Sequence, residues 1–202
     1  KTILSFKNQE TGSGGEGLLI TQGGFTLESI AIENTKGDAV KVEGVDRVFF
    51  KNVRVEWTGE PSSDNGAYGL YPVKCSNVLI ENSIAIGASD AGIYVGQCEN
   101  VIVRNNIAKN NVAGIEIENT TGADVYNNVS QNNTSGLLVF TLPNLPKKEG
   151  HTCRVFNNTL TENNHPNFAK KGTLVSGLPP GNGLIIIAND KVEAFNNTFV
   201  NN

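Results

Sequence analysis

Four residues with aromatic or acidic side chains recur at a near-constant spacing, and together they could bind a sugar. Tyr71 and Tyr94 are 23 residues apart, Glu116 follows after another 22, and Glu118 lies two positions further on. Tyrosine rings pack on the apolar faces of sugars, while carboxylates accept hydrogen bonds from sugar hydroxyls. Neighbouring carboxylates could also act as general acid and base, or bind Ca²⁺. A solvated outer surface without any ligand is the remaining alternative.

Charged residues at related positions extend this set. Lys41 occupies the same position of the repeat as the tyrosines, 30 residues before Tyr71, and Asp64 and Asp90 fall in turns that lead into the same segments. We therefore predict one surface that carries the substrate-binding residues Tyr71, Tyr94, Glu116, Glu118, Asp64 and Lys41 and the catalytic candidates Glu116, Glu118 and Asp90. The sequence contains no CxxC, HExxH or Walker motif. We therefore expect no metal and no cofactor, apart from the Ca²⁺ alternative.

A repeat of about 22 residues must position these side chains. Short apolar segments follow a small residue, with offsets of 22, 30, 23, 22, 22 and 47, at Gly17, Ala39, Gly69, Gly92, Gly114, Gly136 and Gly183. Two further segments of alternating character follow each of these, as VLIEN and IAIGA do after Gly69. Each period thus holds three short strands.

Three strands per period predict an all-β fold, a right-handed, single-stranded parallel β-helix. Each coil would stack on the next at roughly 4.8 Å and bury its inner face against its neighbours. A leucine-rich repeat of similar length would need an L-x-x-L-x-L-x-x-N signature, which is absent. We expect about seven coils in a single domain over residues 1–202. Because the chain starts without Met inside a strand-like pattern, we interpret it as a fragment or mature part of a longer chain.

Doubled asparagines mark the turns of the repeat, as in RNNIAKNN and YNNVSQNN. Asparagine tolerates the left-handed backbone region, and stacked coils allow its amides to bond along a ladder. We predict a structural ladder of Asn82, Asn105, Asn127, Asn157 and Asn196.

Two of the three cysteines share one position on adjacent coils. Stacking brings the Cα atoms of Cys75 and Cys98 to roughly 5 Å, which is within disulfide range. A disulfide and a pair of stacked thiols are equally consistent with this placement. Cys153 aligns with inward-facing valines and is predicted to lie in the core.

Composition limits the classes of partner. Only 18% of the residues are charged and the net charge is −4, so we expect no nucleic-acid surface. The longest apolar run, LIIIA, has the length of a strand, so no membrane span is predicted.

Three long insertions border the predicted first strand of the coils, at residues 58–65, 142–152 and 164–182. Insertions in solenoids often crowd the binding face. An apolar stripe of Leu138, Phe140, Ile185 and Ile187 would lie exposed beside them. We expect the proline-rich insertions to cover this stripe, with a partner protein as the alternative.

The segments EWTG, DNGAYG and ASDAGIYVGQ make the chain resemble a bacterial family of right-handed parallel β-helix repeat proteins within the pectate-lyase-like group of solenoids. The resemblance extends over nearly the whole chain. It implies an extracytoplasmic protein that is periplasmic, secreted or lipoprotein-anchored. Family members are often encoded beside a c-type cytochrome-like protein. The wider group includes polysaccharide lyases, epimerases and hydrolases, but fold alone does not transfer an activity.

Two functional hypotheses follow. The first is a β-helix protein that binds or processes a polysaccharide or cell-surface glycan on the outer face of the first sheet. Whether it is an enzyme stays open; if it is one, it resembles a lyase, an epimerase or a hydrolase. The second is a non-catalytic interaction or assembly protein that partners a c-type cytochrome-like protein.

Overall fold

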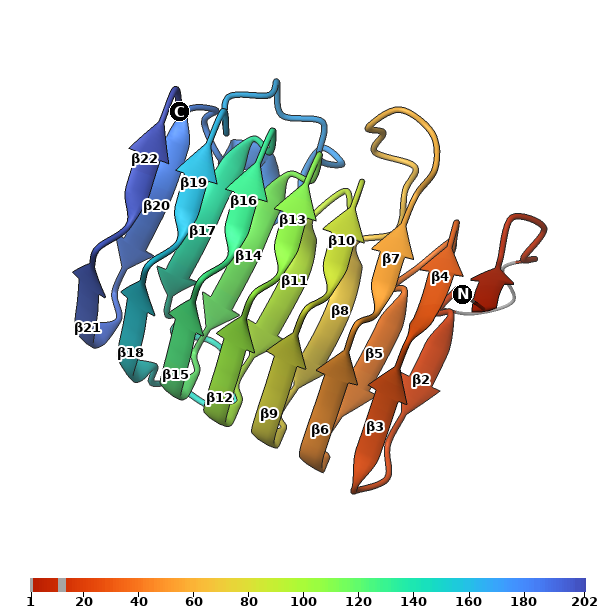
Figure 1. The fold of residues 1–202 in the computed structure, drawn as a ribbon, viewed down its shortest axis with the longest axis horizontal. Helices are drawn as coiled ribbons and strands as arrows, with labels where there is room; N and C mark the ends of the chain where they lie inside the picture. The colour runs from red at the N-terminus through yellow and green to blue at the C-terminus, as the bar shows by residue number, and fades with distance from the viewer. Residues whose placement is uncertain (1, 11–13) are drawn as a thin grey trace.

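The structure is a computed structural model that describes residues 2–10 and 14–202. Its strands form three parallel sheets, in which each strand pairs with its counterparts one turn earlier and one turn later (Figure 1). Sheet 1 contains β2 (Leu18–Ile20), β5 (Val40–Glu43), β8 (Tyr68–Val73), β11 (Ala91–Gly96), β14 (Ala113–Glu118), β17 (Ser135–Phe140) and β20 (Asn182–Ile187).

The other two sheets complete each turn. Sheet 2 contains β3 (Phe25–Glu28), β6 (Asp46–Lys51), β9 (Ser76–Glu81), β12 (Glu99–Arg104), β15 (Thr121–Tyr126), β18 (His151–Phe156) and β21 (Asp190–Phe195). Sheet 3 contains β1 (Thr2–Ser5), β4 (Ile30–Glu33), β7 (Arg54–Glu56), β10 (Ile84–Ile86), β13 (Ile107–Lys109), β16 (Val129–Gln131), β19 (Thr159–Thr161) and β22 (Thr198–Val200). The predicted parallel β-helix is therefore confirmed.

The core is a set of stacked aliphatic side chains inside the coils. In sheet 1, Leu70 pairs with Ile93, Ile93 with Ile115 and Ile115 with Leu137, and all four are fully buried. Alternate residues of each strand point outward, because side chains alternate between the two faces of a strand. The register thus fixes which residues of sheet 1 leave the core.

The asparagine ladder runs through a different column from the one predicted. Asn82, Asn105, Asn127, Asn157 and Asn196 have φ between 52° and 56° and exposed side chains, so they form the left-handed turns. This turn directs the following residue inward, and the buried amides of that next column hydrogen-bond from coil to coil. Asn106 Nδ2 donates to Asn128 Oδ1 at 3.0 Å, and Asn128 Nδ2 donates to Asn158 Oδ1 at 3.0 Å.

A second ladder lies at the corner between sheets 3 and 1. Asn111 Nδ2 donates to Asn133 Oδ1 at 3.0 Å, and Asn133 Nδ2 donates to Asn163 Oδ1 at 2.9 Å. Each of these asparagines is fully buried. The second asparagine of each pair in RNNIAKNN, Asn106 and Asn111, therefore hydrogen-bonds buried backbone and side-chain groups at a corner of the coil.

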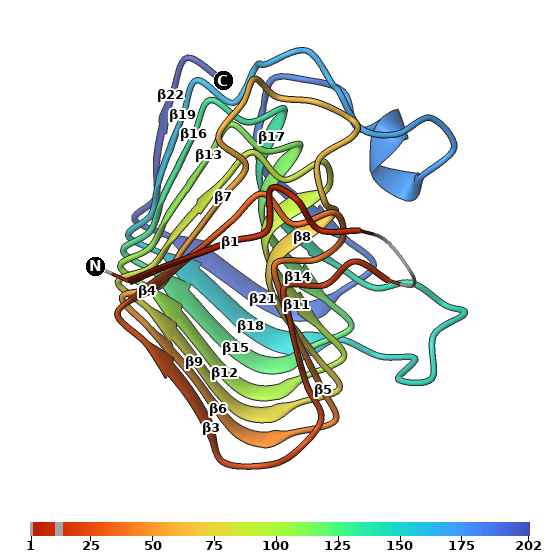
Figure 2. The ribbon, with the colours of Figure 1, turned by 90° about the vertical axis from the view of Figure 1, so that its right-hand side faces the viewer.

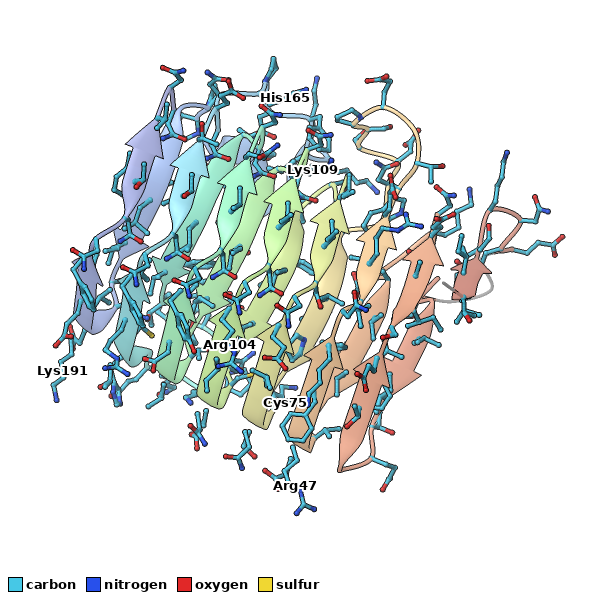
Figure 3. All side chains as sticks on the ribbon, in the orientation of Figure 1. Arg47, Cys75, Arg104, Lys109, His165 and Lys191 are labelled. Carbon is cyan, nitrogen blue, oxygen red and sulfur yellow. The ribbon has the colours of Figure 1, made fainter. Side chains whose placement is uncertain are left out.

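Cys75 and Cys98 adopt the stacked-thiol arrangement and not the disulfide. The structure holds them, together with Cys153, as free and buried thiols. Cys75 lies in the turn between β8 and β9 (Figure 3), and its backbone N–H donates to Cys98 Sγ at 3.4 Å. Cys153 is fully buried in the core, as predicted.

The long insertions gather beside sheet 1, to the right in Figure 2. The segments 141–150 and 162–181, the latter with the short 3₁₀ helix η1 (Leu174–Gly177), place Leu142 and Leu178 against Leu138 and Phe140. The expectation that insertions cover the apolar stripe is confirmed for Leu138 and Phe140, whereas Ile187 stays 55% exposed. Among the described residues, no helix has the length and apolar character of a membrane span.

Candidate functional site

The predicted stripe on sheet 1 stacks as expected but is not a surface. Tyr94 pairs with Glu116, and Glu118 pairs with Gly96 on the same outward face. Yet Tyr94, Glu116 and Glu118 are only 7%, 1% and 5% exposed. The expectation of a solvent-facing stripe was therefore wrong at these three residues, because the insertions fold over the sheet.

Three tyrosines form a cluster under this cover. The ring of Tyr68 lies 4.6 Å from those of both Tyr71 and Tyr94, and the rings of Tyr71 and Tyr94 are 4.9 Å apart. The Lys41 ammonium lies 5.5 Å from the Tyr71 ring centroid, in cation–π range. Tyr71 and Lys41 are half-buried, so this part of the predicted set borders solvent.

A cleft of about 470 Å³ opens beside the cluster. It lies between the insertion that precedes β8 and the segment that carries η1. Its lining includes Lys36, Asp38, Asp64, Asp90 and Lys170. Two of the predicted residues, Asp64 and Asp90, thus meet in one cleft, whereas Glu116 and Glu118 do not line it.

Tight stacking of the coils shapes the floor of this cleft. A Cβ at Gly66 would overlap the carbonyl oxygen of Gly37 in the preceding coil, so only glycine fits there. The backbones of these two coils can therefore approach closely. Asp38 directly follows Gly37, and the backbone N–H of Asp90 in the next coil donates to the carbonyl oxygen of Ala67 at 3.1 Å.

Asp90 is a buried carboxyl at the floor of the cleft. Burial is the main cause that raises its pKa to about 7; the Tyr68 hydroxyl lowers this pKa, and the charges of Asp38 and Glu118 raise it. Its Oδ1 atom has no hydrogen-bond partner among the described residues. A carboxyl with this pKa holds a transferable proton near neutral pH.

Asp38 is the second carboxyl of the cleft. Its Oδ1 accepts a hydrogen bond from the Tyr68 backbone N–H at 3.2 Å. Burial raises the pKa of Asp38 to about 6, although this hydrogen bond and the charge of Lys41 both lower it. Tyr68 therefore contacts both acids, one through its backbone and one through its hydroxyl.

Two more carboxyls lie behind the cleft. Burial raises the pKa of Glu118 to about 7. Burial and the charge of Asp90 raise the pKa of Glu116 well above its ordinary value. Asp90 is linked electrostatically to Asp38, Glu116 and Glu118, so ionisation of one of these acids disfavours ionisation of the acid linked to it.

The sequence interpretation missed four residues of this site, namely Lys36, Asp38, Tyr68 and Lys170. The sequence does contain a signal for Asp38, because Asp38 lies in the turn before β5 much as Asp90 lies in the turn before β11. Lys36 and Lys170 are exposed lysines that line the cleft from two different turns. Nothing periodic in the sequence places Lys170 over sheet 1.

Metal binding was the alternative use of the acids. Within residues 2–10 and 14–202, the structure brings no three His, Cys, Asp or Glu side chains together as a metal site. The cleft places Asp38 and Asp90, whose pKa values are raised, in one lining with Lys36 and Lys170.

Comparison with solved structures finds the same fold. The A-module of mannuronan C-5 epimerase AlgE6 from Azotobacter vinelandii aligns with a TM-score of 0.60 at 16% sequence identity. The alignment includes 91% of this chain and 53% of the epimerase chain, so the protein spans about half of that structure. At this identity the similarity concerns the fold alone.

Sequence comparisons give the family. No curated protein matches the chain. The family model described as "Right handed beta helix region" matches residues 16–202, and these residues include every strand from β2 to β22. The chain therefore belongs to the right-handed beta helix family.

Proposed function

We propose that the cleft binds a carbohydrate and processes it by acid–base chemistry. The observation that carries this proposal is the pair Asp38 and Asp90, with pKa values of about 6 and about 7, at the floor of an open cleft. General acids and bases work best when their pKa lies near the operating pH. Perturbed carboxyls in a cleft are typical of functional sites.

The environments of the two carboxyls suggest their roles. Asp90 is the more buried and binds its proton more tightly, so it is the proton donor. Asp38 is half-buried and lies near Lys41, so it ionises first and accepts a proton. One group gives a proton and the other takes one, which suits both proton exchange at a sugar carbon and cleavage of a glycosidic bond.

An acidic polysaccharide is the substrate class that fits the rim best. Lys36 and Lys170 can pair with the carboxylate of a uronate, and Asp64 can accept hydrogen bonds from sugar hydroxyls. The shared fold with a mannuronan epimerase module supports testing uronates first. An extracytoplasmic location is part of this proposal, since polysaccharides of this kind lie outside the cytoplasm.

The buried tyrosines act from behind the cleft in this proposal. Tyr94 is too buried to stack on a sugar, and the Tyr68 side chain lies against Asp90. We assign Tyr68 the role of positioning Asp90. Tyr71, half-buried under Lys41, is the tyrosine of the predicted set that a ligand can reach from solvent.

Calorimetry with a panel of oligosaccharides tests binding. We expect oligouronates to bind wild-type protein, and Asp38→Asn to retain binding while losing product formation. Glu60→Gln, which changes an exposed carboxyl that belongs to the same insertion as Asp64 but does not line the cleft, is the matched control. A folded protein that binds none of the saccharides would contradict the proposal and favour a non-catalytic interaction protein, with the cytochrome-like partner as its first candidate.

A further inference from the structure

A second pocket lies beneath the segment that carries η1. Its volume is about 240 Å³, and its lining shares no residue with the cleft. Leu138, Phe140, Leu142 and Leu178 contribute apolar walls, and Glu116 is its one titratable lining residue. An apolar cavity of roughly 150 Å³ already accepts a molecule of the size of benzene.

Glu116 is an unusual group for such a place. Its side chain is 1% exposed, and Oε1 has no hydrogen-bond partner among the described residues. The ion pairs found in the described part of the chain do not include it. Burial without a cation raises the pKa of Glu116 well above its ordinary value, so this environment favours the neutral carboxyl.

A neutral carboxyl offers one O–H donor and one carbonyl acceptor. A ligand head that both accepts and donates, such as a primary amide or a hydroxyl, satisfies both groups. An anionic head would meet no cation in this pocket, and the apolar walls would not replace its hydration. The body of the ligand must be apolar to match the leucine and phenylalanine walls.

The residues at the mouth of the pocket also favour a ligand with an apolar body. Leu174 and Ile187 line it and are 67% and 55% exposed, which makes them two of the most exposed large apolar side chains described. A bound apolar body would remove part of their surface from water, which is the main source of affinity in such sites.

We propose that this pocket binds a small neutral amphiphile, with an aliphatic body between Leu138, Phe140 and Leu178 and an amide or hydroxyl head on the Glu116 carboxyl. This inference does not depend on carbohydrate binding in the cleft.

Ligand-detected NMR and calorimetry at pH 7 test the proposal with hexanamide, hexanoate and hexylammonium as probes. We expect hexanamide to bind at one saturable site and both ions to bind at least about tenfold more weakly. Glu116→Gln keeps a neutral donor and acceptor and should retain hexanamide. Glu116→Leu removes both and should weaken hexanamide binding by at least about tenfold.

A second pair of variants keeps the test independent of buried substitutions. Leu174→Asp places a charge at the exposed mouth and should abolish hexanamide binding. Ser176→Asp places the same charge in η1 at a residue that does not line the pocket, and should leave binding intact. Equal affinity for all three probes, no saturable binding to wild-type protein, or an unaffected Leu174→Asp variant would overturn the proposal. Saccharide titrations at saturating hexanamide report on the cleft separately.

Discussion

The backbone N–H of Tyr68 donates to Asp38 Oδ1 at 3.2 Å, while the side chain of the same tyrosine lies against Asp90 of the next coil and lowers its pKa. One residue of β8 thus holds two carboxyls that sit on different coils. Because both acids have raised pKa values, Tyr68 connects the two proton-binding groups on which the proposed function depends.

Stability should fall as the pH rises from about 4.5 to about 7. Asp38, Asp90 and Glu118 have folded-state pKa values of about 6, about 7 and about 7, all above their ordinary values. The unfolded chain therefore releases these protons first, and the stabilisation is lost as pH passes through the folded-state pKa values. Exposed Glu43, whose pKa is lowered, titrates below this window.

The Asp90→Asn variant isolates one contribution to this slope. A pKa raised from 3.8 to about 7 makes ionisation of Asp90 less favourable in the folded protein than in the unfolded chain by up to about 4 kcal/mol, at about 1.4 kcal/mol for each tenfold change in proton affinity. Urea unfolding at several pH values should show a flatter profile for the variant and a higher free energy of unfolding at pH 7.5. A wild-type profile that rises over this range would contradict the raised pKa values.

The inner asparagine column should matter more for stability than the turn column. Asn128 is buried, donates to Val103 O and Asn158 Oδ1, and accepts from Asn106, so Asn128→Ala leaves several buried groups unpaired. We expect a loss of about 2 to 4 kcal/mol in the free energy of unfolding.

Asn127 is the matched comparison, because it is exposed and adjacent. Its φ of 55° makes Asn127→Ala cost about 1 kcal/mol, and Asn127→Gly close to nothing. Equal losses for Asn127→Ala and Asn128→Ala in denaturant unfolding would contradict the assignment of the ladder to the inner column.

The repeat allowed the fold, the strand register and the outward residues of sheet 1 to be predicted, since stacking depends only on the 22-residue period. Tyr94 and Glu116 do pair as the spacing predicts. The period could not reveal which member of each asparagine pair faces inward, because that depends on the left-handed turn at the first. It also could not place the insertions, which follow no period. Their positions decide that Glu116 is buried and that Lys170 reaches the cleft.

The cysteines should react as three buried thiols. Cys75, Cys98 and Cys153 are free and buried, so a thiol reagent should titrate them slowly in native protein and fully after unfolding without reductant. Buried thiols are inert because the reagent cannot reach them. Recovery of one thiol per chain after unfolding would show instead that Cys75 and Cys98 form the disulfide.

The two lysines at the cleft should select for acidic sugars. Lys36→Ala and Lys170→Ala should each weaken oligouronate binding by roughly two- to fivefold, with a larger effect at low salt, because exposed ion pairs are weak and screened. Binding of a neutral oligosaccharide should not change. Lys171→Ala, an exposed neighbour outside the lining, is the matched control. If calorimetry shows that Lys171→Ala weakens oligouronate binding as much as Lys36→Ala and Lys170→Ala do, the proposed contact between these two lysines and the sugar carboxylate is contradicted.

The most direct test of the proposed function follows oligouronate substrates by ¹H NMR over time with wild-type protein and Asp90→Asn. We expect new sugar proton signals with the wild type, and a rate at least about a hundredfold lower with Asp90→Asn while oligouronate binding persists. Folded wild-type protein that leaves every oligouronate unchanged, or an Asp90→Asn variant that reacts at the wild-type rate, would contradict it.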